Sequence, residues 1–201
     1  GVCFARQFLI NNDDNDNEFT CRLDDDVIIE PDYLSKLLQV IEKGYDIASG
    51  ITPPIMNPIL MRENKKVHPI INRIDLDNEG NITYFGDDCG MEYLDEEILP
   101  AHHFRSCCLY KSEINKKVKY ELNLSPIGFR EESFFSFNAI LNGYKIGVHT
   151  TAIAFHLLCP SGGCRLPEDA YRYSVNLDNE TFIKYVKKVF KEKGSIFKYE
   201  N

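Results

Sequence analysis

Three adjacent carboxylates, Asp24, Asp25 and Asp26, stand between an apolar lead-in and the expected start of a helix in the segment CRLDDDVIIEPDYL. Neighbouring like charges repel by roughly a few tenths of a kcal/mol per pair, so an uncompensated triplet is a local cost. The triplet therefore indicates a site that a positive charge completes. A solvated loop at a helix N-terminus is the alternative, since acidic residues suit the helix dipole there.

A second acidic pair, Glu131 and Glu132, stands at the expected start of a later helix in EESFFSFNAILNGYKI. Two adjacent acids at such a position usually complement the helix dipole. The triplet and the pair taken together favour a chemical site over two unrelated surface features.

The elements around the triplet are expected to form a strand, an acidic tip and a helix in that order. FTCRL is short, apolar and β-prone, which predicts a buried strand. A helix is predicted from Pro31 to Gly44, with an apolar face made of Leu34, Leu37, Leu38 and Ile41. YDIASGI predicts the next strand. In such a β-α-β unit ligands bind at the carboxyl ends of the strands, where the triplet lies.

The remaining segments predict an α/β fold with a β-hairpin excursion. VHPIINRIDLDNEGNITYFG reads as two β runs joined at DNEGN, and HHFRSCCLYKSEI as a further strand. The helix that starts at Glu131 is expected to end at Asn142 and Gly143, before the strand-like YKIGVH. Residues 178–194 predict an amphipathic helix docked on the core, with a membrane-facing helix as the alternative.

Composition indicates a single domain over residues 1–201. With 43% hydrophobic and 27% charged residues the chain can bury one core, and its net charge of -8 argues against a nucleic-acid partner. No apolar run approaches the roughly 20 residues of a transmembrane segment. The seven cysteines are odd in number and contain no CxxC pair, which favours reduced thiols and a cytoplasmic location.

In order and spacing, these segments resemble the nucleotide-sugar-dependent glycosyltransferases of family 2. GVCFARQFLI is similar to the family's Gly-x-x-x-Ala-Arg-Asn segment, and LDDDVIIEPDYL to its Asp-x-Asp motif and following helix. HHFRSCCLYKSEI sits where the family has a small-residue strand under the donor sugar. EESFFSFNAILNGYKI resembles the Glu-Asp motif with its helix, and AIAFHL the strand that carries a metal-ligand histidine.

The resemblance implies a GT-A-like, Rossmann-like mixed sheet flanked by helices and a metal-dependent inverting transferase. Such an enzyme moves a sugar from a nucleotide-diphosphate sugar to a hydroxyl of a carbohydrate, lipid-linked or protein acceptor. A divalent cation stabilises the departing diphosphate. Asp26 would ligate it directly, Asp24 would face the ribose or the metal's water shell, and His156 would complete the site. Mg²⁺ suits the oxygen ligands, while an imidazole favours Mn²⁺.

The resemblance also assigns a base and further donor contacts. The base that deprotonates the acceptor would be Glu132, with Glu131 as runner-up, although the family has Asp at the position of Glu132. Donor contacts would come from Asp24, Asp25, Arg6, Gly162, Gly163 and Arg165. For the loop HLLCPSGGCR that holds the last three, a plain surface turn is the alternative to closure over the diphosphate.

The family's first strands, which hold the nucleotide base, precede the segment that GVCFARQFLI resembles. The resemblance therefore implies a fold truncated at its N-terminal part, with a longer chain, a partner or a homo-oligomer supplying or covering the missing half. A non-catalytic carbohydrate- or metal-binding module that keeps the fold is the alternative function.

Overall fold

A curled mixed sheet forms the centre of the fold. The computed structural model describes residues 1–14, 16–55, 69–87, 97–105, 107–157, 166–194 and 196–197. Within them a six-stranded sheet has the order β1-β7-β3-β8-β2, with β6 beside β8. Its strands are β1 (Phe19–Arg22), β2 (Val27–Ile29), β3 (Ile47–Ile51), β6 (Ile98–Ala101), β7 (Cys108–Lys111) and β8 (Ile146–His156).

Strand β8 is the longest strand among the described residues. It joins strands β1, β7 and β3 to strands β2 and β6. Along one edge it runs parallel to β3, and along the other it pairs antiparallel with β6 near its start and with β2 near its end. The segments YKIGVH and AIAFHL, expected as separate strands, both contribute to β8. β-branched side chains continue through the junction at Thr150, Thr151 and Ile153, and they favour an uninterrupted strand.

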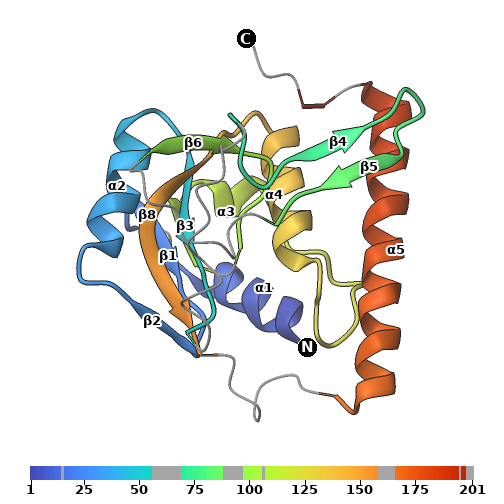
Figure 1. Ribbon diagram of the computed structural model, residues 1–201, viewed down its shortest axis with the longest axis horizontal. Helices are drawn as coiled ribbons and strands as arrows, with labels where there is room; N and C mark the ends of the chain where they lie inside the picture. Colours follow the sequence, from blue (N-terminus) through green and yellow to red (C-terminus); the bar gives the residue numbers. More distant parts are fainter. Residues whose placement is uncertain are drawn as a thin grey trace.

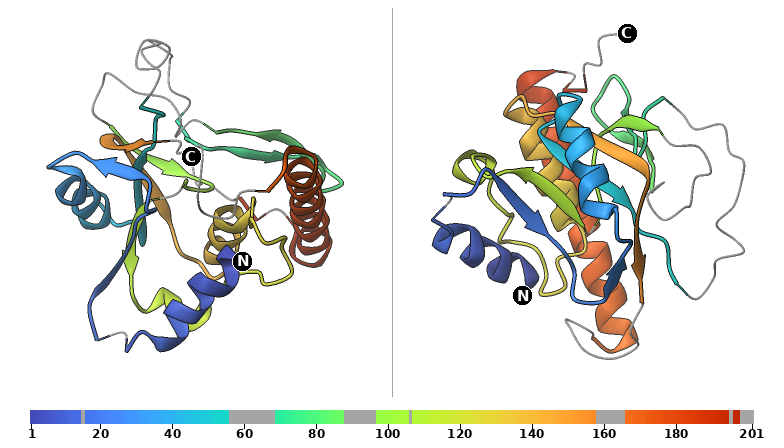
Figure 2. Two further views of the ribbon diagram at one scale, coloured as in Figure 1. Left: turned by 90° about the horizontal axis from the view of Figure 1, so that it is seen from below. Right: turned by 90° about the vertical axis from the view of Figure 1, so that its left-hand side faces the viewer.

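Helices flank the sheet on both faces (Figures 1 and 2). The helix α2 (Tyr33–Glu42) packs on one face, and α1 (Val2–Asn12) and α4 (Glu131–Leu141) pack on the other. The long helix α5 (Glu168–Lys193) packs outside α4, and the hairpin of β4 (Ile74–Leu76) and β5 (Ile82–Phe85) lies against it. The short helix α3 (Ile114–Lys117) follows β7. The fold is therefore α/β, with a curled mixed sheet flanked by helices.

The strand β1 is an edge strand, which corrects the expectation of a buried one. Among the described residues it pairs with β7 alone, and Cys21 in its middle is exposed. An apolar and β-prone run predicts a strand but not its place in the sheet, which depends on pairing with distant segments.

The two adjacent histidines lie after β6 and not on a strand, which is a second correction. The Ile74 N–H donates to His102 Nδ1 at 2.7 Å, and His103 Nε2 lies 2.8 Å from the carbonyl oxygen of Gly86. Both imidazoles thus hold the ends of the β4–β5 hairpin on the core.

The helix expected over residues 178–194 is the second part of α5, which begins at Glu168. Its buried side chains include Phe182, Val186 and Val189, and they pack with Phe134 and Phe137 of α4. No helix in the described part of the chain is both long and apolar enough to cross a membrane.

Candidate functional site

The carboxylate of Asp26 meets the imidazole of His156 at one end of the sheet. The strand β2 begins at Val27, which pairs with His156 in the antiparallel register with β8, so Asp26 in the preceding turn lies beside the histidine. Asp26 Oδ1 is 3.0 Å from His156 Nε2, although 130 positions separate the residues. Their side chains are 20% and 24% exposed, which leaves both within reach of a ligand from solvent.

The spacing of this pair suits two ligands of one cation. Two ligands at about 2.1 Å from an octahedral cation, at right angles to each other, lie about 3 Å apart. Across the described residues, no group of three or more His, Cys, Asp or Glu side chains gathers in a way that could hold a metal ion. A cation held by Asp26 and His156 would therefore take its other ligands from outside the described residues, and substrate oxygens and water can supply them.

The other two carboxylates of the triplet lie apart from this pair. Asp24 Oδ1 accepts a hydrogen bond from Arg6 Nη2 at 3.0 Å, and Asp25 is exposed. The structure therefore does not bring Asp24 to Asp26 and His156 as a third ligand. Arg6 supplies a positive charge beside Asp24, and Asp26 contacts His156, so these two carboxylates of the triplet have different partners.

Arg6 also connects the triplet to the glutamate pair in the first turn of α4. Its guanidinium contacts Glu131, and Arg6 Nη1 lies 3.6 Å from Glu132 Oε1. Arg22, the last residue of β1, places Nη2 2.9 Å from Glu131 Oε1 and 2.7 Å from Glu132 Oε1. Two arginines and three carboxylates thus form one network that runs from α4 to the acidic turn.

The two glutamates differ in accessibility. The side chain of Glu131 is 3% exposed and that of Glu132 is 21% exposed. Both carboxylate oxygens of Glu131 accept hydrogen bonds from Arg22, which leaves this carboxylate little room for a substrate. Of the pair, Glu132 is the one that a substrate hydroxyl can approach.

The charge state of Glu132 is set by two opposing effects. Burial by itself raises the pKa of Glu132, but the guanidiniums of Arg22 and Arg6 outweigh it, so the pKa lies below its ordinary value of 4.5. Glu132 is therefore ionised at neutral pH and can accept a proton, although its basicity is weakened by the arginines.

The sequence alone does not identify Arg22 as part of the candidate site. Its side chain is 9% exposed, and besides both glutamates it donates to the Tyr120 hydroxyl at 3.3 Å. The sequence does show an arginine at the end of an otherwise apolar strand, two positions before the first carboxylate of the triplet. A buried arginine requires carboxylate partners, and the sequence does not show that these come from residues more than a hundred positions away.

The loop residues Gly162, Gly163 and Arg165 lie outside the described residues, so their expected place near the diphosphate stays a prediction.

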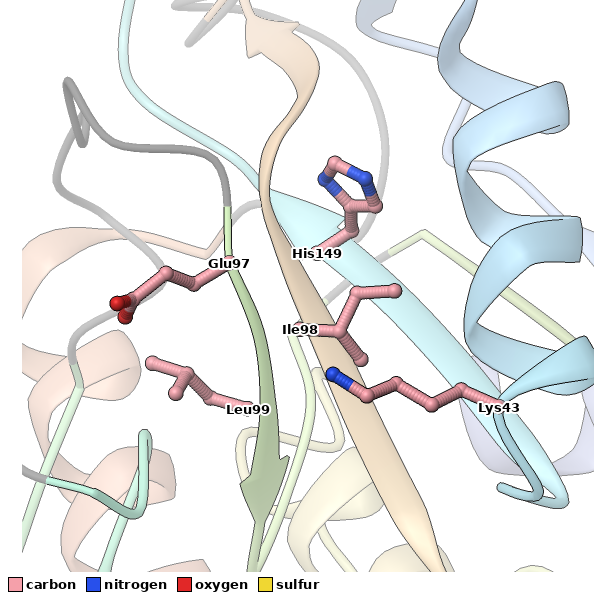
Figure 3. Close-up of a pocket in the computed structure, with 5 residues that line it drawn as sticks. All are labelled: Lys43, Glu97, Ile98, Leu99 and His149. Atoms are coloured by element: carbon pink, nitrogen blue, oxygen red, sulfur yellow. The ribbon is translucent and has the colours of Figure 1, made fainter.

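A separate pocket of about 370 Å³ lies where the C-terminal end of α2 approaches β6 and β8 (Figure 3). Figure 3 shows that Glu97 and Leu99 point to one side of β6, whereas Ile98, Lys43 and His149 lie on the other. In an extended strand His149 is about 23 Å from His156. Because its polar groups do not converge and it is remote from the acidic turn, this pocket is not the candidate site.

Comparisons with known proteins assign neither a family nor a function to this chain. No protein-family model matches the chain, and no curated protein matches it. Among solved structures the chain is similar to one titled "Crystal Structure of A197 from STIV", with 13% sequence identity and a TM-score of 0.48 over 79% of this chain and 69% of that chain. We assign no function from this similarity.

Proposed function

We propose that this chain is a metal-dependent inverting glycosyltransferase, or the catalytic part of one, with a GT-A-like fold. It would transfer a sugar from a nucleotide-diphosphate sugar to an acceptor hydroxyl. The observation that carries the proposal is the contact of Asp26 with His156, at the separation of two adjacent ligands of one cation. The family resemblance of the surrounding segments supports it.

Asp26 and His156 would hold the cation, and two protein ligands suffice when the substrate's phosphates supply others. The bound cation would neutralise the charge that develops on the diphosphate as it leaves. An imidazole among the ligands favours Mn²⁺ over Mg²⁺. In this proposal Asp24, held by Arg6, would face the donor ribose and would not be a direct ligand of the cation.

Glu132 would serve as the base. In the transfer, the acceptor oxygen forms a bond to the anomeric carbon, the bond from that carbon to the phosphate oxygen breaks, and the hydroxyl proton moves to the Glu132 carboxylate. Because Glu132 is ionised at neutral pH, it is in the state that this role requires. Arg22 and Glu131 would orient Glu132, since both are more deeply buried than it is.

A non-catalytic carbohydrate- or metal-binding module is the second candidate. One observation favours it: both glutamates are engaged by arginines, which lower the basicity of Glu132. A module that binds a carbohydrate or a metal without catalysing a reaction does not require a strong base.

Release of nucleoside diphosphate discriminates the two candidates. The protein is incubated with Mn²⁺ and a panel of nucleotide sugars, and free nucleoside diphosphate is measured. The transferase predicts release from at least one donor and its loss in Asp26→Asn, with Glu180→Gln as a control that removes an exposed surface carboxylate. No release from any donor, together with retained Mn²⁺ binding, would establish the binding module.

A further inference from the structure

Asp178 is a fully buried carboxylate in the first half of α5. Within the described part of the chain, its carboxylate accepts three hydrogen bonds, and all of them come from the loop that leads into α4. Its Oδ1 accepts from the Ser125 N–H at 2.7 Å, and its Oδ2 accepts from the Ser125 hydroxyl at 2.7 Å and from the Phe129 N–H at 2.8 Å. The donors are two backbone amides and a hydroxyl, so the buried carboxylate is held by hydrogen bonds to the loop.

The loop from Ser125 to Arg130 ends at the two glutamates. Within it the Gly128 N–H donates to the Ser125 carbonyl, and the Glu131 N–H donates to the Gly128 carbonyl, both at 3.0 Å. The next residue of α5 also contacts the loop, since Arg130 Nε donates to Asn179 Oδ1 at 2.6 Å. The loop's backbone thus determines where the first turn of α4 begins, and α5 holds that backbone from outside.

The loop also contacts the helix that carries Arg6. The Val2 N–H donates to the Pro126 carbonyl at 3.2 Å, and an added Cβ on Gly128 would overlap Val2. A displacement of this loop would therefore move α1 and α4 relative to each other. Glu132, in the first turn of α4, would then leave the position in which it meets Arg6.

We propose that Asp178 is a positioning residue for sugar transfer, which holds the loop from Ser125 to Phe129 so that Glu132 faces the acceptor hydroxyl. This inference rests on the proposed function, in which Glu132 is the base. A buried carboxylate is costly unless it is hydrogen-bonded, so its presence here indicates that the loop needs an acceptor-only group. Asparagine cannot replace it, because its NH₂ would face either the Ser125 N–H or the Phe129 N–H.

The test compares three variants with the wild type. Asp178→Asn removes one acceptor from the loop, Ser125→Ala removes the hydroxyl bond alone, and Glu180→Gln removes an exposed carboxylate two residues along the same helix. Measurements are kcat, donor KM, affinity for Mn²⁺ with nucleoside diphosphate, thermal unfolding, and amide hydrogen exchange at Ser125 and Phe129.

The expected result is a fall in kcat of about 10- to 100-fold in Asp178→Asn, since a shift of roughly 1 Å in a catalytic group has effects of that size. Exchange at Ser125 and Phe129 should be faster, while donor KM and affinity for Mn²⁺ with nucleotide change less than about twofold, because Asp26 and His156 do not contact the loop. Ser125→Ala should show a smaller loss in the same direction, and Glu180→Gln should match the wild type.

Transfer at the wild-type kcat in Asp178→Asn would overturn the inference. It would also be overturned if kcat and the affinity for Mn²⁺ with nucleotide fell equally and followed the folded fraction, since Asp178 would then be purely structural. If Asp178→Asn does not fold, Ser125→Ala is used in its place. The inference is then overturned if Ser125→Ala keeps the wild-type kcat, or if its kcat and its affinity for Mn²⁺ with nucleotide fall equally and follow the folded fraction. A wild type that transfers no sugar contradicts the proposed function itself, before any variant is compared.

Discussion

At the scale of single residues, the acidic triplet has three environments. Asp24 pairs with Arg6, Asp25 is exposed, and Asp26 contacts His156. Adjacent charges in a chain suggest a common partner, but a turn points successive side chains in different directions. The sequence therefore indicates that positive charge is needed near the triplet, and only the antiparallel register of β2 with β8 shows which carboxylate meets the histidine.

Asp26→Asn should weaken Mn²⁺ binding strongly and leave the metal-free protein as stable as the wild type, or slightly more stable. An amide is a poor cation ligand, yet asparagine can keep the hydrogen bond to His156 and relieves the crowding of negative charge. Calorimetric titration with Mn²⁺ and thermal unfolding without metal check the two parts. A large fall in melting temperature without metal would instead assign Asp26 a structural role.

Glu132→Gln should lower the rate of transfer by about 10² to 10⁴ and keep Mn²⁺-dependent nucleotide binding, since removal of a base leaves the donor site intact. Glu131→Gln should mainly reduce stability, because it leaves the buried guanidiniums of Arg22 and Arg6 with less compensation. Transfer rates, nucleotide titrations and melting temperatures of both variants are compared. Loss of transfer in Glu131→Gln with normal transfer in Glu132→Gln would reverse the two roles.

At the scale of elements, capping residues and helical spacing predict where the helices lie. Which face of each helix is buried depends on packing against distant segments. The helix α4 ends at Leu141, before Asn142 and Gly143, as its sequence predicts. The buried face of α2 is Tyr33, Leu37 and Val40, whereas Leu34 and Leu38 of the expected face are 42% and 40% exposed. Both sets of residues have helical spacing. Which set is buried is decided only by the position of the sheet beneath the helix.

Gly128→Ala should reduce the free energy of unfolding by at least about 2 kcal/mol, whereas Gly143→Ala should cost about 1 kcal/mol. Both glycines have positive φ, +61° and +85°, so both substitutions strain the backbone. A Cβ at Gly128 also overlaps Val2 and lies 3.0 Å from Cys3 Sγ, but none of the surroundings lies within 4 Å of a Cβ at Gly143. Urea unfolding measures the free energy of unfolding of both variants. Equal losses of this free energy would show that the loop and α1 are not tightly packed.

At the scale of the whole molecule, the α/β class and the hairpin excursion follow from the sequence pattern. The edge position of β1 and the network of Arg6 and Arg22 with the glutamates do not, because they depend on contacts between segments far apart in the chain. Arg22 is an example. The sequence shows its charge, but only the packing of β1 beside α4 shows that its partners are the two glutamates.

Stability should fall on acidification in two pH ranges. Burial lowers the pKa of His103 below its ordinary value of 6.5, despite the nearby Asp87 and with the help of Arg130, so the unfolded chain binds its proton first and stability decreases below about pH 6.5. The lowered pKa of Glu132 adds a second decrease below 4.5, the value in the unfolded chain.

Thermal unfolding from pH 8 to pH 4 tests these ranges. His103→Gln can still donate to the Gly86 carbonyl but does not titrate, so its melting temperature should change less than that of the wild type between pH 7 and pH 5. Parallel pH dependence in the two proteins would show that His103 does not cause the first decrease.

The proposed role of Asp26 and His156 is to hold a cation on the diphosphate of a sugar nucleotide. Pulsed electron paramagnetic resonance of Mn²⁺, bound in the presence of a nucleoside diphosphate, tests it most directly. We expect coupling to ³¹P from the diphosphate and to an imidazole ¹⁴N in the same complex, with the ¹⁴N signal lost in His156→Gln and the affinity for Mn²⁺ reduced in Asp26→Asn. Coupling to ³¹P without imidazole nitrogen, or the same ¹⁴N signal in His156→Gln, would contradict it.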